Sequence, residues 1–206
     1  RGANNSLNSN LTSGNAVETQ SLISFDSDGF TVGSGGGVNE NSQTYVAWNW
    51  KANGQGSSNT DGSINTTYTS VNTTSGFSIS KYTGNAVIGA TVGHGLGAVP
   101  KMIIVKNLSA SGDWIVYHEA LGNTKRLRLN TTAGEETNAF WNDTTPTSSV
   151  WSMNDNGDGN ASGSNYIAYC FAEKTGYSKI GSYVGTGNTD GAFIYTGFKP
   201  DFVMIK

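Results

Sequence analysis

Several features that would indicate particular functions are scarce in this sequence. It has one cysteine, Cys170, so neither an intrachain disulfide nor a zinc site built from several cysteines can form. No apolar run approaches the length that crosses a membrane, and no signal peptide is recognisable. Charged residues make up 13% of the chain, against about 25% in typical soluble proteins. The net charge of −3 argues against nucleic acid as a partner, because binding phosphates requires clustered lysine and arginine.

Residues that favour β-strands are abundant instead. The chain has 28 glycines, 9 tyrosines, 8 phenylalanines and 5 tryptophans, but only 3 prolines. Short alternating apolar runs, bounded by Gly, Asn, Asp or Ser, recur about every 8–12 residues, as in sandwiches and barrels. We therefore predict an all-β protein with strands at Leu22–Phe25, Phe30–Val32, Thr44–Lys51, Phe77–Tyr82, Lys101–Asn107, Trp114–Tyr117, Arg126–Asn130, Ser149–Met153, Tyr166–Glu173, Phe193–Phe198 and Asp201–Lys206.

Three segments of the chain occur twice, in the same order. Gly76–Lys106 and Gly176–Lys206 share Gly-aromatic-Ser, Tyr-x-Gly and Gly-x-x-Pro, followed by an apolar run that ends in lysine. The other pairs are Thr44–Lys51 with Asn165–Ala172, and Leu7–Gly14 with Leu127–Gly134. Ordered repetition is typical of arrayed proteins. We therefore predict two related antiparallel β-sandwich units, jelly-roll-like, that arose by internal duplication.

The repeat also predicts how the chain is divided. Residues 1–52 would be the C-terminal part of a first β unit, and residues 53–75 a linker or long exposed loop. Residues 76–206 would form a second unit, with a further copy beginning near 176. We expect the first copy to lack its beginning and both ends to be cut from something longer. Within the linker, Ile64, Tyr68 and Val71 indicate one extended strand.

One pair of repeated strands predicts core residues. Because side chains alternate between the two faces of a strand, TYVAWNW places three large residues on one face, and NYIAYCF does the same. We expect these residues to be buried in equivalent places: Val46, Trp48 and Trp50 in one copy, and Ile167, Tyr169 and Phe171 in the other. Cys170, between two aromatic residues, is expected to be a buried and inert thiol.

Side chains suited to catalysis are few and scattered. His94 lies in a glycine-rich turn, and His118-Glu119 lacks the second histidine of a zinc-protease motif. Glu135 and Glu136 are adjacent, so on a strand they would point to opposite faces rather than flank one glycosidic bond. We therefore predict no catalytic residues and no enzymatic activity.

Sugar binding is a chemistry for which the sequence offers candidates. Trp141, Asn142 and Asp143 combine an aromatic ring, which can pack on the face of a sugar, with groups that bond to hydroxyls. This composition predicts a ligand-binding loop. The alternative, which we favour, is that Trp141 anchors the loop over the core.

A second candidate is a calcium loop. Asn154, Asn156 and Asp158 fit the ligand positions in the first half of an oxygen-rich calcium-binding loop. The bidentate glutamate expected later is missing, because position 165 is asparagine. Clusters of Asn, Asp and Gly are also usual in tight turns, and we favour a turn here. No other metal or cofactor is predicted.

The whole chain resembles a known kind of module. It contains the motifs GFSISKYTGN, VGHGLGAVPKMIIVKN, DWIVYHEALG, LRLNTTAGEE, TYVAWNWKA and NYIAYCFAEKTGYSKIGSYVGTGN. Together they resemble a repeat module that is widespread in marine bacteriophages, especially those of cyanobacteria and related hosts. The module occurs in tail-fibre-like and other virion structural proteins, and the resemblance implies no catalytic residues.

The resemblance implies a non-enzymatic structural protein of the virion, such as a tail fibre, an appendage or a capsid decoration, that contributes to host-surface attachment. Low charge and apolar edges predict self-association, and a homotrimer would suit a fibre. Its partners would then be other virion proteins and a host surface glycan. Two alternatives stay open: a glycan-binding, lectin-like module of a secreted bacterial surface protein, and a polysaccharide depolymerase.

Overall fold

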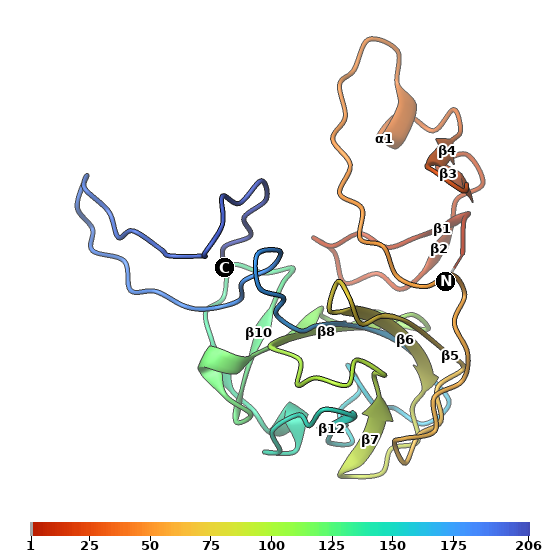
Figure 1. Ribbon diagram of the computed structural model, residues 1–206. Helices are drawn as coiled ribbons and strands as arrows, with labels where there is room; N and C mark the ends of the chain where they lie inside the picture. Colours follow the sequence, from red (N-terminus) through yellow and green to blue (C-terminus); the bar gives the residue numbers. More distant parts are fainter. Residues whose placement is uncertain (1) are drawn as a thin grey trace.

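The computed structural model describes residues 2–206, which fold almost entirely as β-structure (Figure 1). The strands are β1 (Asn5–Ser6), β2 (Ala16–Val17), β3 (Leu22–Phe25), β4 (Phe30–Val32), β5 (Tyr68–Asn72), β6 (Phe77–Thr83), β7 (Ala90–Gly93), β8 (Met102–Asn107), β9 (Ile115–His118), β10 (Lys125–Arg128), β11 (Glu136–Thr137), β12 (Val150–Met153) and β13 (Asn165–Phe171). The short helix α1 (Gly36–Asn39) and the 3-10 turns η1 (Glu119–Leu121) and η2 (Ala139–Trp141) lie between them. The all-β prediction is confirmed. No helix within residues 2–206 is long and apolar enough to cross a membrane.

Seven strands form one antiparallel sheet in the order β11-β10-β9-β8-β13-β6-β5. β13 lies inside this sheet, where Tyr169 is opposite Ile79 of β6 on one side and Ile104 of β8 on the other. Its β-branched and aromatic residues suit a strand with neighbours on both sides. Because β13 separates β6 from β8, the sheet is complete only when the chain has returned to residue 171.

The main core lies between this sheet and a second layer made of β7 and β12. Tyr82 stacks on Tyr166 with ring centroids 5.3 Å apart, and it meets Trp151 edge-on at 5.9 Å. All three rings are fully buried. The hydroxyl of Tyr82 donates to the carbonyl of Gly159 at 2.8 Å, which satisfies its polar end. Two packed β layers make the fold sandwich-like.

The outer face of the seven-stranded sheet carries a smaller apolar cluster. Ile104, Trp114 and Val116 are buried there, and Leu7 of the N-terminal segment packs against them. The alternation of side chains along β8 explains the two faces, since Ile103 points into the main core and Ile104 to the outer cluster. One face of an antiparallel sheet can be exposed to water. Both faces of this sheet carry apolar clusters, so both have to be covered by other parts of the chain.

Residues 2–52 form an N-terminal segment that rises from the body (Figure 1). β1 pairs with β2 and β3 pairs with β4, while α1 follows and the chain then returns to the body without further strands. The stretch 53–75, predicted to be a linker or loop, contributes β5 to the edge of the main sheet, where Val71 is opposite Ser78. The predicted extended strand is therefore present at Tyr68 and Val71, whereas Ile64 lies outside β5 and forms an isolated bridge with Val92 of β7.

Three predicted strands are absent from the described part of the chain: Thr44–Lys51, Phe193–Phe198 and Asp201–Lys206. Val46 and Trp48, expected in the core, are 77% and 62% exposed, and Trp50 is exposed as well. The core prediction is wrong for this copy because no described strand flanks Thr44–Lys51. An isolated strand gains too few contacts to be stable.

The matching residues of β13 behave differently. Ile167 is buried as predicted, whereas Tyr169 and Phe171 are half-buried and pack against the outer cluster. The same alternating pattern therefore gives a paired strand between β6 and β8, and an unpaired stretch in residues 44–51. Tertiary neighbours, rather than the residue pattern, decide between the two outcomes.

The C-terminal arm, residues 181–206, leaves the body as a long excursion without strands (Figure 1). Its large side chains, among them Val184, Phe193 and Tyr195, are largely exposed. Residues 176–206, which include this arm, repeat the sequence of residues 76–106, which form β6, β7 and β8 in the body. The arm therefore has the residue pattern of strands in a sheet, but no described strand pairs with it.

Two hairpins in the chain have the same register. The paired residues are Asn5↔Val17 and Ser6↔Ala16 in β1–β2, and Lys125↔Thr137 and Arg126↔Glu136 in β10–β11. Each residue of the second hairpin lies 120 positions after its counterpart, which is also the spacing between Leu7–Gly14 and Leu127–Gly134. The two hairpins are alike in structure, although few of their residues are identical.

A helical turn further along repeats in the same way. The pattern is a pair of backbone N–H groups that donate to one carbonyl three and four residues earlier. The donors are Val38 and Asn39 to Gly35 in α1, and Gly159 and Asn160 to Asn156 after β12. The same pair of hydrogen bonds also runs from Tyr177 and Ser178 to Lys174, so this turn geometry is not specific to the repeat.

Candidate functional site

The predicted sugar-binding residues lie on η2 and the turn after it. Trp141 is only 1% exposed, and its ring centroid lies 5.5, 4.7 and 5.7 Å from those of Tyr117, Phe140 and Trp151. Because the ring is enclosed in the main core, it cannot stack on a sugar. The candidate sugar-stacking role of Trp141 is therefore contradicted, and the alternative favoured from the sequence, a loop anchored over the core, describes the structure.

Asn142 and Asp143 form the turn that follows η2. Both have left-handed backbones, with φ of 53° and 47°. The N–H of Asn142 donates to the carbonyl of Ala139 at 2.9 Å and so closes the 3-10 turn. Asn and Asp tolerate this conformation better than other residues with a side chain. Their presence here is explained by the turn.

The candidate calcium residues lie in the turn after β12. The side-chain oxygen of Asn156 accepts from the N–H of Asp158 at 2.8 Å, and that of Asn154 accepts from Asp155 at 2.8 Å. The carboxylate of Asp158 accepts from the N–H of Asp113 at 3.2 Å. These oxygens serve the turn rather than converging on one point. Within residues 2–206, no group of three or more His, Cys, Asp and Glu could bind a metal ion.

Both histidines have structural contacts. The ring of His94 is buried, its Nδ1 accepts from the N–H of Leu96 at 3.2 Å, and its Nε2 lies 3.2 Å from the carbonyl of Thr147. Since a carbonyl can only accept, Nε2 carries the proton. The Nδ1 of His118 accepts from the N–H of Ala120 and caps η1. Burial lowers the pKa of both histidines, which favours their neutral forms.

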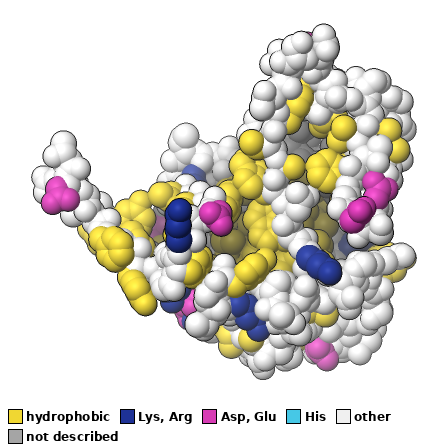
Figure 2. Space-filling view, turned by 45° about the horizontal axis from the view of Figure 1, so that its top comes forward, with side chains coloured by type: hydrophobic (Ala, Val, Ile, Leu, Met, Phe, Trp, Pro, Cys, Tyr) yellow, Lys and Arg dark blue, Asp and Glu magenta, His cyan; other side chains and the backbone are white. Residues whose placement is uncertain are grey.

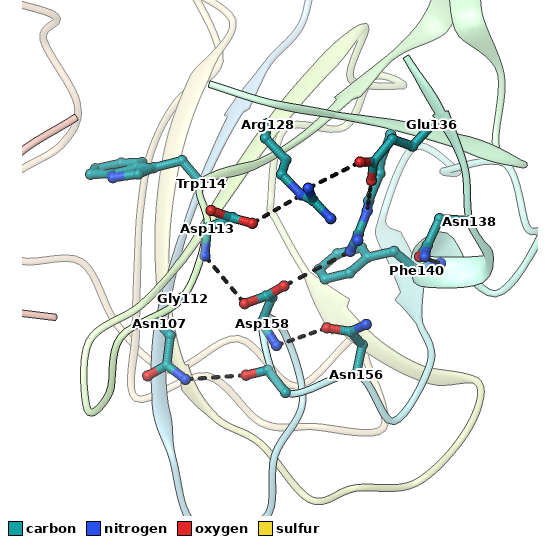
Figure 3. Close-up of polar contacts among 12 residues, drawn as sticks. Asn107, Gly112, Asp113, Trp114, Arg128, Glu136, Asn138, Phe140, Asn156 and Asp158 are labelled. Carbon is teal, nitrogen blue, oxygen red and sulfur yellow. Dashed lines mark hydrogen bonds and ion pairs between the residues drawn. The ribbon is translucent and has the colours of Figure 1, made fainter. Parts of the chain in front are cut away.

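Two arginines of β10 and three carboxylates form a charge network at one end of the main core (Figure 3). Arg126 lies 3.1 Å from Glu136 and 3.8 Å from Asp158. Arg128 lies 2.9 Å from Asp113 and 3.0 Å from Glu136. Each arginine thus contacts two carboxylates. The network joins β10, β11 and the turns before β9 and after β12.

The N-terminal segment covers the outer face where it crosses β8 and β9. The indole N–H of Trp114 donates to the carbonyl of Asn8 at 3.0 Å, and the N–H of Gly112 donates to that of Thr12 at 2.9 Å. Lys106 is fully buried there, and its ammonium donates to the carbonyls of Thr12 and Gly112, both at 2.8 Å. Burial lowers the pKa of Lys106. We call these five residues the N-terminal junction.

The ammonium of Lys106 also lies 6.0 Å from the centre of the Trp114 ring, within the range of a cation–π contact. Gly14 allows the close approach of the loop, because a Cβ there would lie 2.8 Å from the carbonyl oxygen of Leu108. That same oxygen accepts from the N–H of Asn15 at 3.0 Å. The junction is therefore a closely packed contact between the loop and the sheet.

The end of the C-terminal arm meets the counterpart of this loop. The ammonium of Lys206 donates to the carbonyl of Thr131. Leu121, Leu127, residues 131–135 and Lys206 line an open cavity of about 530 Å³, which we call the C-terminal junction cavity. Lys206 repeats Lys106, and this loop repeats Leu7–Gly14. The two loops thus have the same sequence pattern. In each of them a backbone carbonyl accepts a hydrogen bond from the lysine that ends an apolar run.

Hydrophobic side chains gather on the outer face between the N-terminal segment and the arm (Figure 2). The ring of Phe202 lies 5.7 Å from that of Trp48 and 5.9 Å from that of Trp50. Trp50 in turn lies 6.3 Å from Phe171 at the end of β13. These rings form an aromatic seam (Trp48, Trp50, Phe171 and Phe202) that leaves Trp48 largely exposed.

Comparison with known sequences adds a family. The family model for DUF7483, a domain of unknown function, matches residues 1–206. The chain belongs to the DUF7483 family. No curated protein and no solved structure matches it. The description of DUF7483 assigns no activity, so the function has to be argued from the contacts of this chain.

Sequence reasoning missed the most specific contact of this DUF7483 domain, which is the burial of Lys106 against Trp114. One signal was available: both repeated segments end in a lysine after an apolar run. A lysine at an alternating position of a buried strand must find acceptors, because an unpaired buried charge is costly. One acceptor here is the carbonyl of Thr12 in a distant loop, and the other is the carbonyl of Gly112 in the turn before β9, and no side-chain pattern reveals either contact.

Proposed function

We propose that this DUF7483 domain is a non-enzymatic structural module of a virion fibre, appendage or decoration, built from units that repeat along the chain. The observation that carries the proposal is the hairpin β1–β2, which has the register of β10–β11 at a spacing of 120 residues. Units that repeat in sequence and in register extend a protein in one direction. Extension is the mechanical task of a fibre.

The repeated elements support an internal duplication. The body contains a unit from β6 to β13, and the N-terminal segment contains counterparts of its hairpin β10–β11 and of the helical turn after β12. Residues 176–206, most of which form the C-terminal arm, carry the sequence of β6 to β8. In this interpretation the chain holds one complete unit and parts of two more.

Contribution to host attachment is a further part of the proposal. It is supported by the resemblance of the repeated motifs to modules of virion proteins and by the exposed aromatic side chains of the segment and arm. Self-association, as in a homotrimeric fibre, would cover the aromatic seam and the apolar residues of the arm. Other virion proteins and a host surface glycan are the proposed partners.

The experiment that tests the structural role is sedimentation velocity over a range from micromolar to hundreds of micromolar protein, with negative-stain electron microscopy. We expect the mass to rise with concentration and the particles to be elongated. A compact monomer at every concentration would contradict the proposal. A glycan array tests attachment separately, since the absence of binding would remove the adhesive part and leave the structural part.

A further inference from the structure

We propose that a polar cavity between the N-terminal hairpin and the outer face of the main sheet binds an acidic sugar, a pyranose that carries one carboxylate or sulfate beside its hydroxyl groups. This inference rests on the proposed function, because it names the chemical class of the host surface glycan. The cavity, which we call the asparagine cavity, has a volume of about 210 Å³ and is lined by Asn5, Asn15, Lys81, Leu108, Ser109 and Asn165.

Three parts of the fold supply the side chains of this cavity. β6 places Lys81 on the outer face, because side chains alternate along a strand and the next residue points into the main core. Ser109 follows β8, and Asn165 is the first residue of β13. Asn5 lies on β1 and Asn15 directly precedes β2. Residues far apart in the sequence therefore converge on one polar hollow.

Hydrogen bonds between these parts fix the walls of the cavity. The N–H of Asn15 donates to the carbonyl of Leu108 at 3.0 Å, and the N–H of Leu108 donates to the carbonyl of Asn165 at 2.8 Å. The N–H of Asn165 donates to the hydroxyl oxygen of Ser109 at 2.9 Å. The side-chain amide of Asn15 donates to the Oδ1 of Asn5 at 2.8 Å. A ligand would therefore meet walls that are already in place, which lowers the cost of binding.

Several polar groups of the walls have no partner among residues 2–206. The Oδ1 of Asn15 is buried and accepts no hydrogen bond. The ammonium of Lys81 forms neither an ion pair nor a hydrogen bond. The Oδ1 of Asn165 accepts from Thr83 at 3.2 Å, which leaves the two amide hydrogens of Asn165 as donors. The hydroxyl hydrogen of Ser109 is left in the same way. Groups of this kind are satisfied by water or by a ligand.

The chemistry of the unpaired groups selects the ligand. Most of them are donors, one is positively charged, and none of the six lining residues is acidic. A ligand that fits is rich in acceptors, carries a negative charge and offers a hydroxyl donor to the Oδ1 of Asn15. An acidic pyranose meets all three requirements. A neutral sugar would leave the ammonium of Lys81 unpaired, and a simple anion would leave Asn15 without a donor.

The size and charge of the cavity narrow the class further. Its volume lies below the range of about 300–1,000 Å³ that is typical of sites for drug-sized ligands, so it admits one sugar residue rather than an oligosaccharide. One lysine balances one negative charge. This suits a carboxylate or a sulfate ester better than a phosphate monoester, which carries a charge of about −1.5 to −2 at neutral pH.

An aromatic residue lies beside the cavity. Tyr68 of the edge strand β5 is opposite Lys81 in the β5–β6 ladder, so both side chains lie on the same face of the sheet. Tyr68 is 40% exposed. An aromatic ring can pack on the C–H face of a sugar. Tyr68 therefore offers a contact to the neighbouring residue of a glycan whose acidic residue occupies the cavity.

The test is a titration of the isotope-labelled full chain, followed by the amide signals in NMR spectra. The probes are methyl β-glucuronoside, a methyl β-galactoside sulfated at its primary hydroxyl, methyl β-glucoside, sodium acetate and sodium sulfate. We expect saturable shifts of the amides of Asn15, Ser109 and Asn165 with an acidic sugar, at a Kd of about 1 mM. The glucoside and the two salts should bind at least about tenfold more weakly.

The probes also separate the outcomes. Binding of one acidic sugar alone identifies the acid group, and binding of both shows that the cavity accepts either group. Absence of saturable shifts with both acidic sugars would overturn the inference. Equal binding of the glucoside would overturn the role of the charge, and equal binding of acetate or sulfate would show a site for a small anion rather than for a sugar.

Lys81→Gln is the decisive variant of the chain. It removes the positive charge, so binding of the acidic sugar should fall at least about tenfold, whereas Lys81→Arg keeps the charge and should bind within about threefold of the original chain. Lys199→Gln, at an exposed position on the C-terminal arm, is the matched control for loss of one charge and should bind as the original chain does. The midpoint of urea unfolding should be the same for all of these chains, because the ammonium of Lys81 makes no bond within residues 2–206. Unchanged binding by Lys81→Gln would overturn the inference.

This titration and the tests of the proposed function fail separately. If the chain assembles but no acidic sugar binds, the asparagine cavity is not a sugar site and the structural role stands. If an acidic sugar binds but the chain stays monomeric, the sugar site stands and self-association of this chain is wrong. Binding of neutral glycans alone on the array would support attachment and contradict the acidic sugar site.

Discussion

Trp141 and Trp48 are the same kind of residue in opposite environments. Trp141 lies in the main core against Tyr117, Phe140 and Trp151, whereas Trp48 is largely exposed on the aromatic seam. We predict that Trp141→Ala lowers the free energy of unfolding by about 3–5 kcal/mol, because it leaves a cavity in a packed core. Trp48→Ala should change it by less than about 1 kcal/mol. Urea unfolding of both variants measures the difference, and similar losses would contradict the placement of Trp141.

Cys170 gives a prediction on pH dependence. Burial raises the pKa of its thiol to about 12, while the unfolded thiol ionises near its ordinary value, about 8.5. Between these values the folded chain holds a proton that the unfolded chain has lost. Stability that is fully present below the lower pKa should therefore fall as the pH rises, by at most about 1.4 kcal/mol per pH unit.

The measurement is urea unfolding near neutral pH and at about pH 10, for the original chain and for Cys170→Ala. Other groups that titrate in this range are common to both chains, but Cys170 also contributes to the raised pKa of the buried Tyr82, so the comparison measures the thiol together with this coupling. The original chain should lose more stability than the variant. Equal losses would show that the thiol ionises as readily in the folded state as in the unfolded one.

At the scale of single elements, β10 carries two neighbouring ion pairs of different kinds. Arg126 is 7% exposed and contacts Glu136 and Asp158, whereas Lys125 pairs with Glu135 at the surface. We predict that Arg126→Met lowers the free energy of unfolding by about 3 kcal/mol, because it leaves carboxylates of the network without their partner. Lys125→Met should cost less than about 1 kcal/mol.

Urea unfolding of the two variants tests this prediction, and the Lys125 variant serves as the control for loss of one positive charge from the same strand. The salt dependence adds a second readout, since the exposed pair should be screened more strongly than the partly buried network. Equal effects of the two substitutions would mean that the network does not stabilise this edge of the sheet.

The elements also show what could be predicted from the sequence. Alternation and turn residues located β3 and β4 on the expected residues and β6, β8, β12 and β13 to within two residues. The same signals predicted strands at 44–51, 193–198 and 201–206, which do not form. Alternation reports which side chains could share a face, but hydrogen bonds to a neighbouring strand are what stabilise it. Those neighbours come from distant parts of the chain.

The candidate site was less predictable than the fold. Trp141 was expected either in a sugar site or as an anchor, and only the placement of η2 between β10 and β12 decides for the anchor. Lys106 lies on β8 and Trp114 directly precedes the neighbouring strand β9, but the loop that covers them is about a hundred residues away in sequence. Repetition of the loop and of the lysine could be detected in the sequence, whereas their contact could not.

At the scale of the whole molecule, the two ends of the chain have different roles in stability. Residues of the N-terminal loop cover Trp114 and supply an acceptor for the buried Lys106. The C-terminal arm contacts Trp48 and Trp50 of the N-terminal segment through Phe202, and the body through Lys206, but leaves most of its large side chains in water. Removing each end should therefore have unequal effects, although both belong to the repeated pattern.

We predict that a chain without residues 1–15 is less stable by about 2–3 kcal/mol, because Trp114 becomes exposed and Lys106 loses an acceptor. Its tryptophan emission should also shift to longer wavelength. A chain without residues 181–206 should keep its free energy of unfolding to within about 1 kcal/mol, since the arm forms no strand and buries little apolar area. Urea unfolding followed by fluorescence measures both. A larger loss on removing the arm than on removing the N-terminal residues would mean that the arm is paired with the body in solution.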